Sequence, residues 1–254
     1  TRKESSAASD VYKRQALLGV QSLAWSAEIT VAAASSLSDA FKVIAAQFEK
    51  QHPAVKVNLT FGSSGTLLQQ LRYGAPIDVF ASADQKTMND AQNFFLIQNA
   101  TRTDFTSNRL VLITSTRNPI IIKDLNELKH ANIKHIAIGN PAYTPAGRYA
   151  QDVLEQKQLW VPLQPKLIKT QNVRHALAYV VSGETELGFV FASDAQSQAN
   201  KVRVVMNLVS TTPIRYPIAA AAKSSQPAEA KAFIQYVKSL SLIHISEPTR
   251  LLSI

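Results

Sequence analysis

The chain of 254 residues contains no cysteine. It can therefore form no disulfide, no thiolate metal site, no cysteine nucleophile and no lipid-modified N-terminal cysteine. The five histidines are too scattered along the sequence to form a ligand set. We therefore expect no directly ligated metal and no cofactor.

Long apolar runs are absent too, because no stretch reaches the roughly 18 apolar residues that a membrane-spanning helix needs. A short apolar run, Ala16–Leu23, is followed by AWS at positions 24–26, a small-x-small pattern typical of signal-peptidase sites. We interpret residues 1–26 as a leader followed by the remnant of a signal peptide, which predicts secretion; residues 1–15 are polar, unlike a natural leader, and resemble translated cloning sequence. Residues 242–254 fit no amphipathic continuation of the preceding helix, and we interpret them as a non-native tail.

Acidic residues are in the minority, with 18 Asp and Glu against 27 Lys and Arg and a formal net charge of +9. The basic residues are spread along the chain and form no dense block. We therefore expect no nucleic-acid-binding stripe. A mildly cationic surface does favour anionic ligands, through long-range attraction.

Motifs of common catalytic chemistry are missing as well. A hydrolase elbow needs Gly-x-Ser-x-Gly, and residues 62–65 (GSSG) are followed by Thr66 where a second glycine would have to stand. No phosphate-binding loop or dinucleotide fingerprint occurs. Asp78 and Asp84 flank a predicted strand, and we interpret them as a turn residue and a helix cap, not as metal ligands. We expect no enzyme activity.

What the sequence does contain is a strand–helix junction within Ile29–Ala45. An apolar run predicts a buried strand over Ile29–Ala34, and apolar residues at spacings of three and four predict a helix from Leu37 onward. Ser35 and Ser36 stand between the two. The first N–H groups of a helix have no partner within it and carry partial positive charge, so such a junction attracts anions.

A second junction of this kind lies in Val55–Leu71, where a predicted strand runs through GSSG into a helix. Two serine-bearing junctions in the first third of the chain predict a small anion held by neutral donors. Serine is favoured at helix N-caps in any protein, so on the residues alone Ser36 and Ser64 could equally be simple caps.

Strands and helices alternate along the rest of the chain, which predicts parallel sheets with crossover helices. Predicted strands cover 77–82, 109–115, 134–139, 166–169, 187–191, 202–208 and 215–222, and predicted helices cover 85–95, 124–129, 148–158, 174–182 and 227–240.

Six motifs follow one another in a specific order: AAASSL (32–37), FGSSGTL (61–67), GAPIDVFASADQ (74–85), NPAYTPAGRYA (140–150), NVRHAL (172–177) and LGFVFASDA (187–195). In this combination the chain resembles the periplasmic molybdate-binding proteins of ABC importers, which are type II periplasmic binding proteins. The resemblance covers roughly Ile29–Lys238.

The resemblance implies an α/β fold of two lobes, each a mostly parallel sheet flanked by helices, with the ligand in the cleft between them. It assigns residues 27–107 and 212–241 to the first lobe and residues 108–211 to the second. It also implies a monomer in the periplasm that delivers its ligand to a membrane permease with its ATPase.

The same resemblance implies the binding residues. Ser36 and Ser64 match the family's hydroxyl and amide donors from the first lobe, and Ala146 and Val173 match its backbone N–H donors from the second. Phe191 stands where enterobacterial members have a tyrosine hydroxyl, so one side-chain contact is lost or supplied by another group or by water. The metal would be held as its oxyanion, without direct ligands.

Neutral donors suit molybdate, tungstate or sulfate, which are tetrahedral dianions with acceptors only. The expected function is capture of molybdate or tungstate. The alternatives are a receptor for another oxyanion such as sulfate, with cavity size as the discriminator, and an α/β enzyme acting on an anionic substrate. Arg174, beside one predicted donor, could steer anions, but we interpret it as a solvated residue at a helix start.

Overall fold

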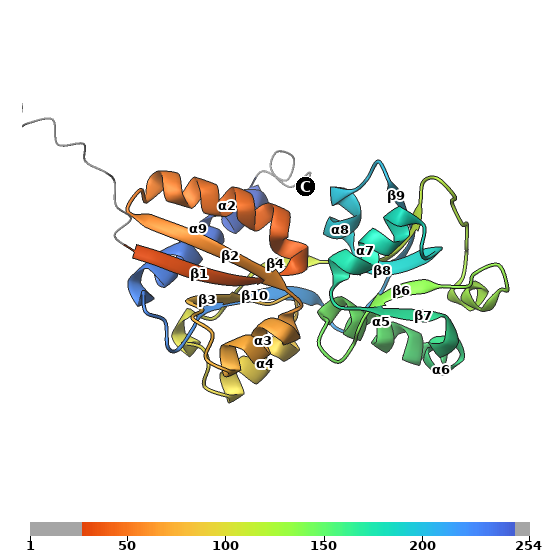
Figure 1. The fold of residues 1–254 in the computed structure, drawn as a ribbon, viewed down its shortest axis with the longest axis horizontal. Helices are drawn as coiled ribbons and strands as arrows, with labels where there is room; N and C mark the ends of the chain where they lie inside the picture. Colours follow the sequence, from red (N-terminus) through yellow and green to blue (C-terminus); the bar gives the residue numbers. More distant parts are fainter. Residues whose placement is uncertain (1–26, 247–254) are drawn as a thin grey trace, which may run out of the picture.

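The structure is a computed structural model that describes residues 27–246, with side chains described as far as Leu240. The predicted signal-peptide remnant therefore lies outside the described residues, as do residues 247–254 of the predicted tail. Within the described part, the chain forms two five-stranded sheets that lie side by side, each flanked by helices (Figure 1).

The first sheet and its helices are called the first lobe. In spatial order its strands are β2 (Val55–Gly62), β1 (Ala27–Ala34), β3 (Val79–Ala81), β10 (Ile214–Ala220) and β4 (Thr103–Asn108). Its helices are α2 (Ser38–Gln51), α3 (Ser64–Arg72), α4 (Gln85–Asn93) and α9 (Pro227–Ser246), with the short 3₁₀ turns η2 (Ser35–Leu37) and η3 (Asn99–Thr101).

The second sheet and its helices are called the second lobe. Its strands, in spatial order, are β7 (Leu167–Thr170), β6 (Ile136–Gly139), β8 (Leu187–Phe191), β5 (Leu110–Ser115) and β9 (Val202–Leu208). Its helices are α5 (Pro145–Gln156), α6 (Trp160–Leu163), α7 (Val173–Ser182) and α8 (Ala192–Ser197), with the 3₁₀ turns η4 (Leu125–Lys129) and η5 (Gln164–Lys166).

Each sheet contains a single reversed strand. In the first lobe β1 is parallel to β2 and β3, and β10 runs antiparallel to both of its neighbours. In the second lobe β6 is parallel to β7 and β8, and β5 is antiparallel to β8 and β9. The sheets are thus mostly parallel, which confirms the predicted fold class.

Apolar strands in the sheet centres explain why the sheets accept helices on both faces. Residues Val31–Ala34 of β1 are all buried, as expected for a parallel strand covered on both sides. On α2 the apolar spacing seen in the sequence buries Phe41 and Phe48, whose rings meet Phe233 of α9 at centroid distances of 6.1 and 5.2 Å. These aromatic contacts fix α2, and with it the junction at its N-terminus, against the first sheet.

The chain passes between the lobes twice, once from β4 to β5 and once from β9 to β10 (Figure 1). The two passages are neighbours, because Asn108 pairs with Ile214 on one side of the crossing and Leu110 pairs with Leu208 on the other. A pair of adjacent strands is the arrangement that permits a hinge between two rigid bodies.

Most predicted elements are confirmed. The short helix α6 was not predicted, and the helix predicted over 124–129 is the 3₁₀ turn η4. Other differences concern β4, α5 and α9. Strand β4 was not predicted, because its sequence TDFTSN is polar and only Phe105 is buried. Helix α5 begins at Pro145, three residues before the predicted start. Helix α9 continues to Ser246, so residues 242–246 extend the helix that was predicted to end near 240. The sequence offers no glycine or proline to stop it before Pro248.

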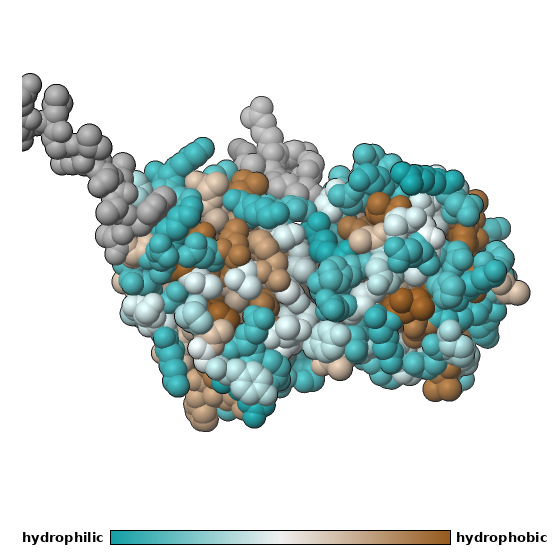
Figure 2. All heavy atoms as spheres, viewed as in Figure 1, coloured by the Kyte–Doolittle hydropathy of each residue, from teal (hydrophilic) through white to brown (hydrophobic). Residues whose placement is uncertain are grey.

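Within residues 27–246 no helix is long and apolar enough to cross a membrane. On the face drawn in Figure 2 hydrophilic residues predominate, and the hydrophobic ones form separate small groups on both lobes. The described residues also contain no group of three or more His, Asp or Glu side chains placed to hold a metal ion.

Candidate functional site

A small cavity lies between the lobes, at the carboxyl ends of β1, β2 and β8. All five residues predicted to bind the ligand line it, together with seven others. The lining residues are Ala34, Ser35, Ser36, Gly62, Ser63, Ser64, Ala83, Thr144, Pro145, Ala146, Val173 and Phe191. Its volume of about 10 Å³ is on the scale of a single water-sized group, so it suits a small ligand and not a drug-sized one.

The first lobe contributes two serines from adjacent strand–helix junctions. Strands β1 and β2 are paired in register up to Ala34 and Gly62, so the residues that follow them lie next to each other. Ser36 lies in η2 and Ser64 is the first residue of α3. Both side chains are buried. The register of the two strands therefore brings together residues 28 positions apart in sequence.

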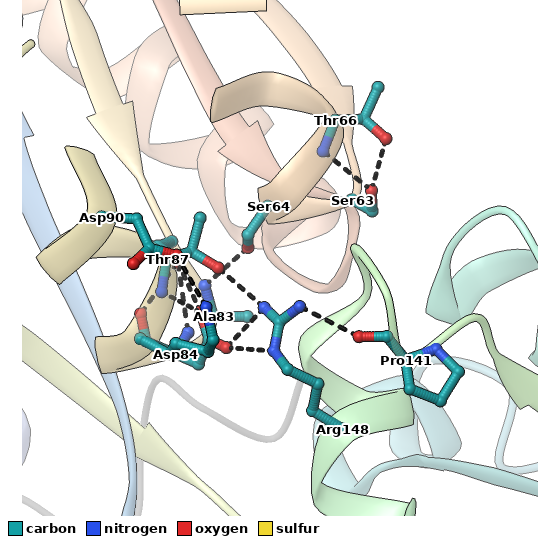
Figure 3. A network of polar contacts seen from close by, with 11 residues as sticks. Ser63, Ser64, Thr66, Ala83, Asp84, Thr87, Asp90, Pro141 and Arg148 are labelled. Carbon is teal, nitrogen blue, oxygen red and sulfur yellow. Dashed lines mark hydrogen bonds and ion pairs between the residues drawn. The ribbon is translucent and has the colours of Figure 1, made fainter. Parts of the chain in front are cut away.

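Neither serine is the helix cap that the sequence alone allowed. The cap of α3 is Ser63, whose hydroxyl oxygen accepts from the Thr66 N–H at 3.2 Å. Ser64 Oγ instead accepts from the Ala83 N–H at 3.0 Å (Figure 3). This bond does not use the Ser64 hydroxyl hydrogen, which remains available for an acceptor in the cavity. The structure thus presents Ser64 as a donor.

The second lobe contributes two helix N-termini. Ala146 is the second residue of α5 and Val173 is the first residue of α7, and both are buried. N–H groups at these positions have no partner in the helical hydrogen-bond ladder, and the helix dipole adds partial positive charge there. Asn172 caps α7 by accepting from the His175 N–H at 3.1 Å, which leaves the Val173 N–H outside the cap.

Phe191 forms the remaining wall. It is 1% exposed, and its ring meets Tyr149 at a centroid distance of 6.4 Å and Tyr216 at 5.6 Å, both edge-on. Tyr216 lies on β10, and its hydroxyl oxygen is 3.0 Å from Ser36 Oγ. A tyrosine hydroxyl is therefore present beside the cavity, but it comes from another strand. No local pattern in the sequence points to this contact, because Tyr216 is 180 positions from Ser36.

The electrostatic character of the cavity comes from dipoles. Among the described residues, those lining it include no charged side chain. The nearby arginine that we expected to be solvated is instead paired: Arg174 is 2.7 Å from Asp194 and 2.8 Å from Asp39, with 22% of its side chain exposed. That prediction was wrong, because the start of α7 faces α2 of the other lobe and not solvent. Burial raises the pKa of Asp194 to about 6, although the Arg174 charge opposes the rise.

A second arginine joins the lobes on the other side of the cavity. Arg148 of α5 contacts the Asp84 carboxylate at 2.6 and 2.9 Å and donates to Thr87 Oγ1 at 2.7 Å (Figure 3). Asp84 also caps α4, as the sequence predicted, by accepting from the Thr87 N–H. We call Arg148, Asp84 and Thr87 the interlobe clasp.

The lobes also meet through the backbone next to Ser64. The Gly65 N–H donates to the Tyr143 carbonyl at 2.9 Å. A Cβ atom at Gly65 would lie 2.7 Å from Tyr143 backbone atoms, so the contact requires glycine. The cavity is therefore bounded by contacts that exist only while the lobes are together.

Comparison with known proteins is consistent with this architecture. Residues 29–245 match the family model of bacterial extracellular solute-binding proteins. The chain is 38% identical to the molybdate-binding protein ModA of Escherichia coli (strain K12), covering 85% of this chain and 85% of that protein. It is 34% identical to ModA of Haemophilus influenzae, covering 86% and 87%.

Among solved structures, the periplasmic molybdate-binding protein of Azotobacter vinelandii superposes with a TM-score of 0.74 at 25% identity, covering 88% of this chain and 99% of that one. The match to the family model extends over nearly all of the described residues, and the relatives match over most of their own length. The chain belongs to the bacterial extracellular solute-binding protein family.

Proposed function

We propose that this protein captures molybdate or tungstate and delivers it to the permease and ATPase of an ABC importer. The observation that carries the proposal is the small interlobe cavity, which is lined by serine hydroxyls and helix N-termini from both lobes. The similarity of the protein to molybdate-binding proteins over most of its length supports the same ligand.

The chemistry of the cavity fits a fully deprotonated oxyanion. Such an anion has only acceptors, and the Ser64 hydroxyl together with the N–H groups of Ala146 and Val173 can only meet it as donors. A protonated anion such as hydrogen phosphate would need an acceptor for its own hydrogen and is disfavoured. Neutral donors also avoid a buried cation that would be left unpaired in the empty protein.

We assign the oxyanion contacts to Ser36, Ser64, Ala146 and Val173, with Phe191 filling the wall. We also propose that residues 27–107 with 212–241 and residues 108–211 move as the two lobes. Closure would complete the donor set, and the interlobe clasp would hold the closed form.

The remaining parts of the proposal concern location and state. Family membership indicates a binding role outside the cytoplasm, and we propose the periplasm, reached by way of the signal sequence in residues 1–26. We further propose that the protein works as a monomer, without a cofactor and without making or breaking bonds in its ligand.

Calorimetric titration of the protein with molybdate, tungstate, sulfate and phosphate tests the ligand. We expect tight binding of molybdate and tungstate and weak or absent binding of sulfate and phosphate. Preferential binding of sulfate would make the protein a receptor for a different oxyanion. A folded sample that binds none of the four anions would contradict the proposal.

A further inference from the structure

The Ser36 hydroxyl has an unusual neighbour for a ligand-binding group. Its oxygen lies 3.0 Å from the Tyr216 hydroxyl oxygen, and either atom could be the donor. Both side chains are buried, with exposed fractions of 7% and 1%. The direction of this hydrogen bond decides whether Ser36 can donate to an anion in the cavity, because a hydroxyl has only one hydrogen.

Asn108 constrains the direction of this hydrogen bond. Its Oδ1 accepts from the Arg109 N–H at 2.9 Å, which identifies the other atom of the amide as the nitrogen. That Nδ2 then donates to the Tyr216 hydroxyl at 3.1 Å and to Ser193 Oγ at 2.8 Å. An amide nitrogen cannot accept, so the Tyr216 oxygen is the acceptor in this contact.

The Tyr216 hydroxyl hydrogen is therefore directed elsewhere. Among the described residues, its hydroxyl has hydrogen-bond contacts only with Asn108 and Ser36. Since Asn108 can only donate, Ser36 Oγ is the one acceptor among the described contacts of the Tyr216 hydroxyl for its hydrogen. Burial raises the pKa of Tyr216 well above its ordinary value, with the Asp194 charge adding to the rise, so the phenol keeps this hydrogen at neutral pH.

We propose that Asn108 and Tyr216 are positioning residues that hold Ser36 as a donor toward the bound oxyanion. The hydrogen bonds run in one direction, from the Asn108 amide to the Tyr216 hydroxyl, from there to Ser36 Oγ, and from Ser36 into the cavity. This inference rests on the proposed function, because it needs an oxyanion in that cavity. Phe191 would then help to hold Tyr216 in place, since the two rings pack edge-on.

The arrangement ties the donor to the crossing between the lobes. Asn108 is the last residue of β4 at the first passage, and Tyr216 follows the second passage by two residues of β10. Ser193, the other acceptor of the Asn108 amide, belongs to α8 of the second lobe. The amide thus spans both lobes, and its contacts with Ser193 and Tyr216 hold together only in a particular relative position of the lobes.

Tyr216→Phe tests the proposal because it removes one oxygen and keeps the buried ring. In this variant the Ser36 hydroxyl loses its fixed orientation, and we expect molybdate to bind about tenfold more weakly by calorimetry. With Ser36→Ala already present, adding Tyr216→Phe should change affinity by less than about twofold, because no hydroxyl is left to orient. Equal losses in both backgrounds, or no loss in either, would overturn the proposal.

Asn108→Asp is a second test, because it should reverse the direction of these hydrogen bonds. A carboxylate can only accept, so Tyr216 would donate to it and Ser36 would turn its hydrogen toward Tyr216 and away from the cavity. We expect a larger loss of affinity than in Tyr216→Phe, and the part caused by reversal should vanish with Ser36→Ala, whereas repulsion by the new charge remains. A loss that is the same with and without the Ser36 hydroxyl contradicts the proposal.

Tyr236→Phe serves as the matched control, because that hydroxyl contacts only Gln47 and Gln51 within the first lobe among its described partners. It should leave affinity unchanged. Urea unfolding of each variant checks that the fold is intact. If the wild type binds molybdate but the effects of Tyr216→Phe and Asn108→Asp are the same with and without Ser36→Ala, the positioning role alone is refuted. If the wild type binds no oxyanion, both this inference and the proposed function are refuted.

Discussion

At the scale of single residues, each serine hydroxyl of the cavity is oriented by a neighbour that donates a hydrogen bond to it. Ser64 Oγ accepts from the Ala83 N–H, and Ser36 Oγ accepts from the Tyr216 hydroxyl. Each serine therefore keeps its hydroxyl hydrogen for another acceptor, and its side chain is held in one orientation. Such fixed donors need no reorganisation when the anion arrives. Selectivity for an unprotonated anion is then a property of the neighbours of the serines as much as of the serines themselves.

Ser64→Ala is expected to weaken molybdate binding by roughly 1–3 kcal/mol, because it removes a donor to a buried charge. Calorimetry gives the loss directly. Ser182→Ala, at an exposed position on the second lobe, is the control and should leave affinity unchanged. A Ser64→Ala protein that melts normally and binds as tightly as the wild type would remove Ser64 from the site.

At the scale of elements, the lobes are joined by helix starts that face each other. The start of α7 places Arg174 between Asp39 of α2 and Asp194 of α8, and the start of α5 places Arg148 on Asp84. Arg174 follows Val173 and Asp84 follows Ala83, so both pairs adjoin residues that line the cavity. The Asp84 carboxylate is 4% exposed, so the charge is well shielded from water while the lobes are together. Opening the lobes would hydrate both partners again.

Arg148→Ala should therefore act on closure more than on folding. In the closed form Asp84 would be buried without its cation, whereas in the open form water would solvate it, so we expect molybdate affinity to fall roughly 10- to 100-fold. The melting temperature of the ligand-free protein should change little. Calorimetry and thermal melts measure the two quantities.

The matched control for this prediction is Arg102→Ala. Arg102 also makes several hydrogen bonds, to Gln85, Asn89 and Gln92, but all of them lie within the first lobe. Its removal should lower stability and spare affinity. If the Arg102 and Arg148 variants lose affinity equally, the interlobe clasp has no special part in binding.

The sequence predicted most of these elements, because apolar runs and helical spacing are local signals. It failed for β4, whose polar residues form an edge strand with one buried side chain, Phe105. It also failed for Arg174, because the partner of a helix-start arginine can lie on another lobe. A local pattern carries no information on what packs against it from a distance.

The candidate site also contains residues that the sequence predicted and residues that only the structure reveals. The resemblance to a known family named five lining residues, but other lining residues, such as Ala83 and Thr144, follow only from the three-dimensional arrangement. Tyr216 could not have been found from the sequence. Its hydroxyl reaches Ser36 because β10 is inserted beside β3, a pairing between segments more than 130 residues apart.

At the scale of the whole molecule, stability and pH are linked through the second lobe. Asp194 is fully buried, and burial raises its pKa to about 6, above the ordinary value of 3.8 that applies to the unfolded chain. Between these values the folded protein holds a proton that the unfolded chain releases. The contribution of this carboxyl to the free energy of unfolding is therefore complete below about pH 4 and is lost as the pH rises through about 6.

Asp194→Asn removes this titration. We expect urea unfolding of the wild type to show a fall in the free energy of unfolding across that window relative to the variant, because all other titrating groups are shared. The difference between the two curves isolates residue 194. A difference that is constant from pH 4 to pH 7 would show that Asp194 does not bind a proton in the folded protein in this range.

The position of β10 also constrains the order in which the molecule can be completed. In the first sheet β4 is hydrogen-bonded only to β10, and β10 is made after the whole of the second lobe. The elements of the second lobe are contiguous in sequence, so its sheet can form without waiting for later residues. The first sheet must await a strand that returns over a long loop, and such distant pairings slow folding. We therefore expect the binding cavity, which needs both lobes, to form late in folding.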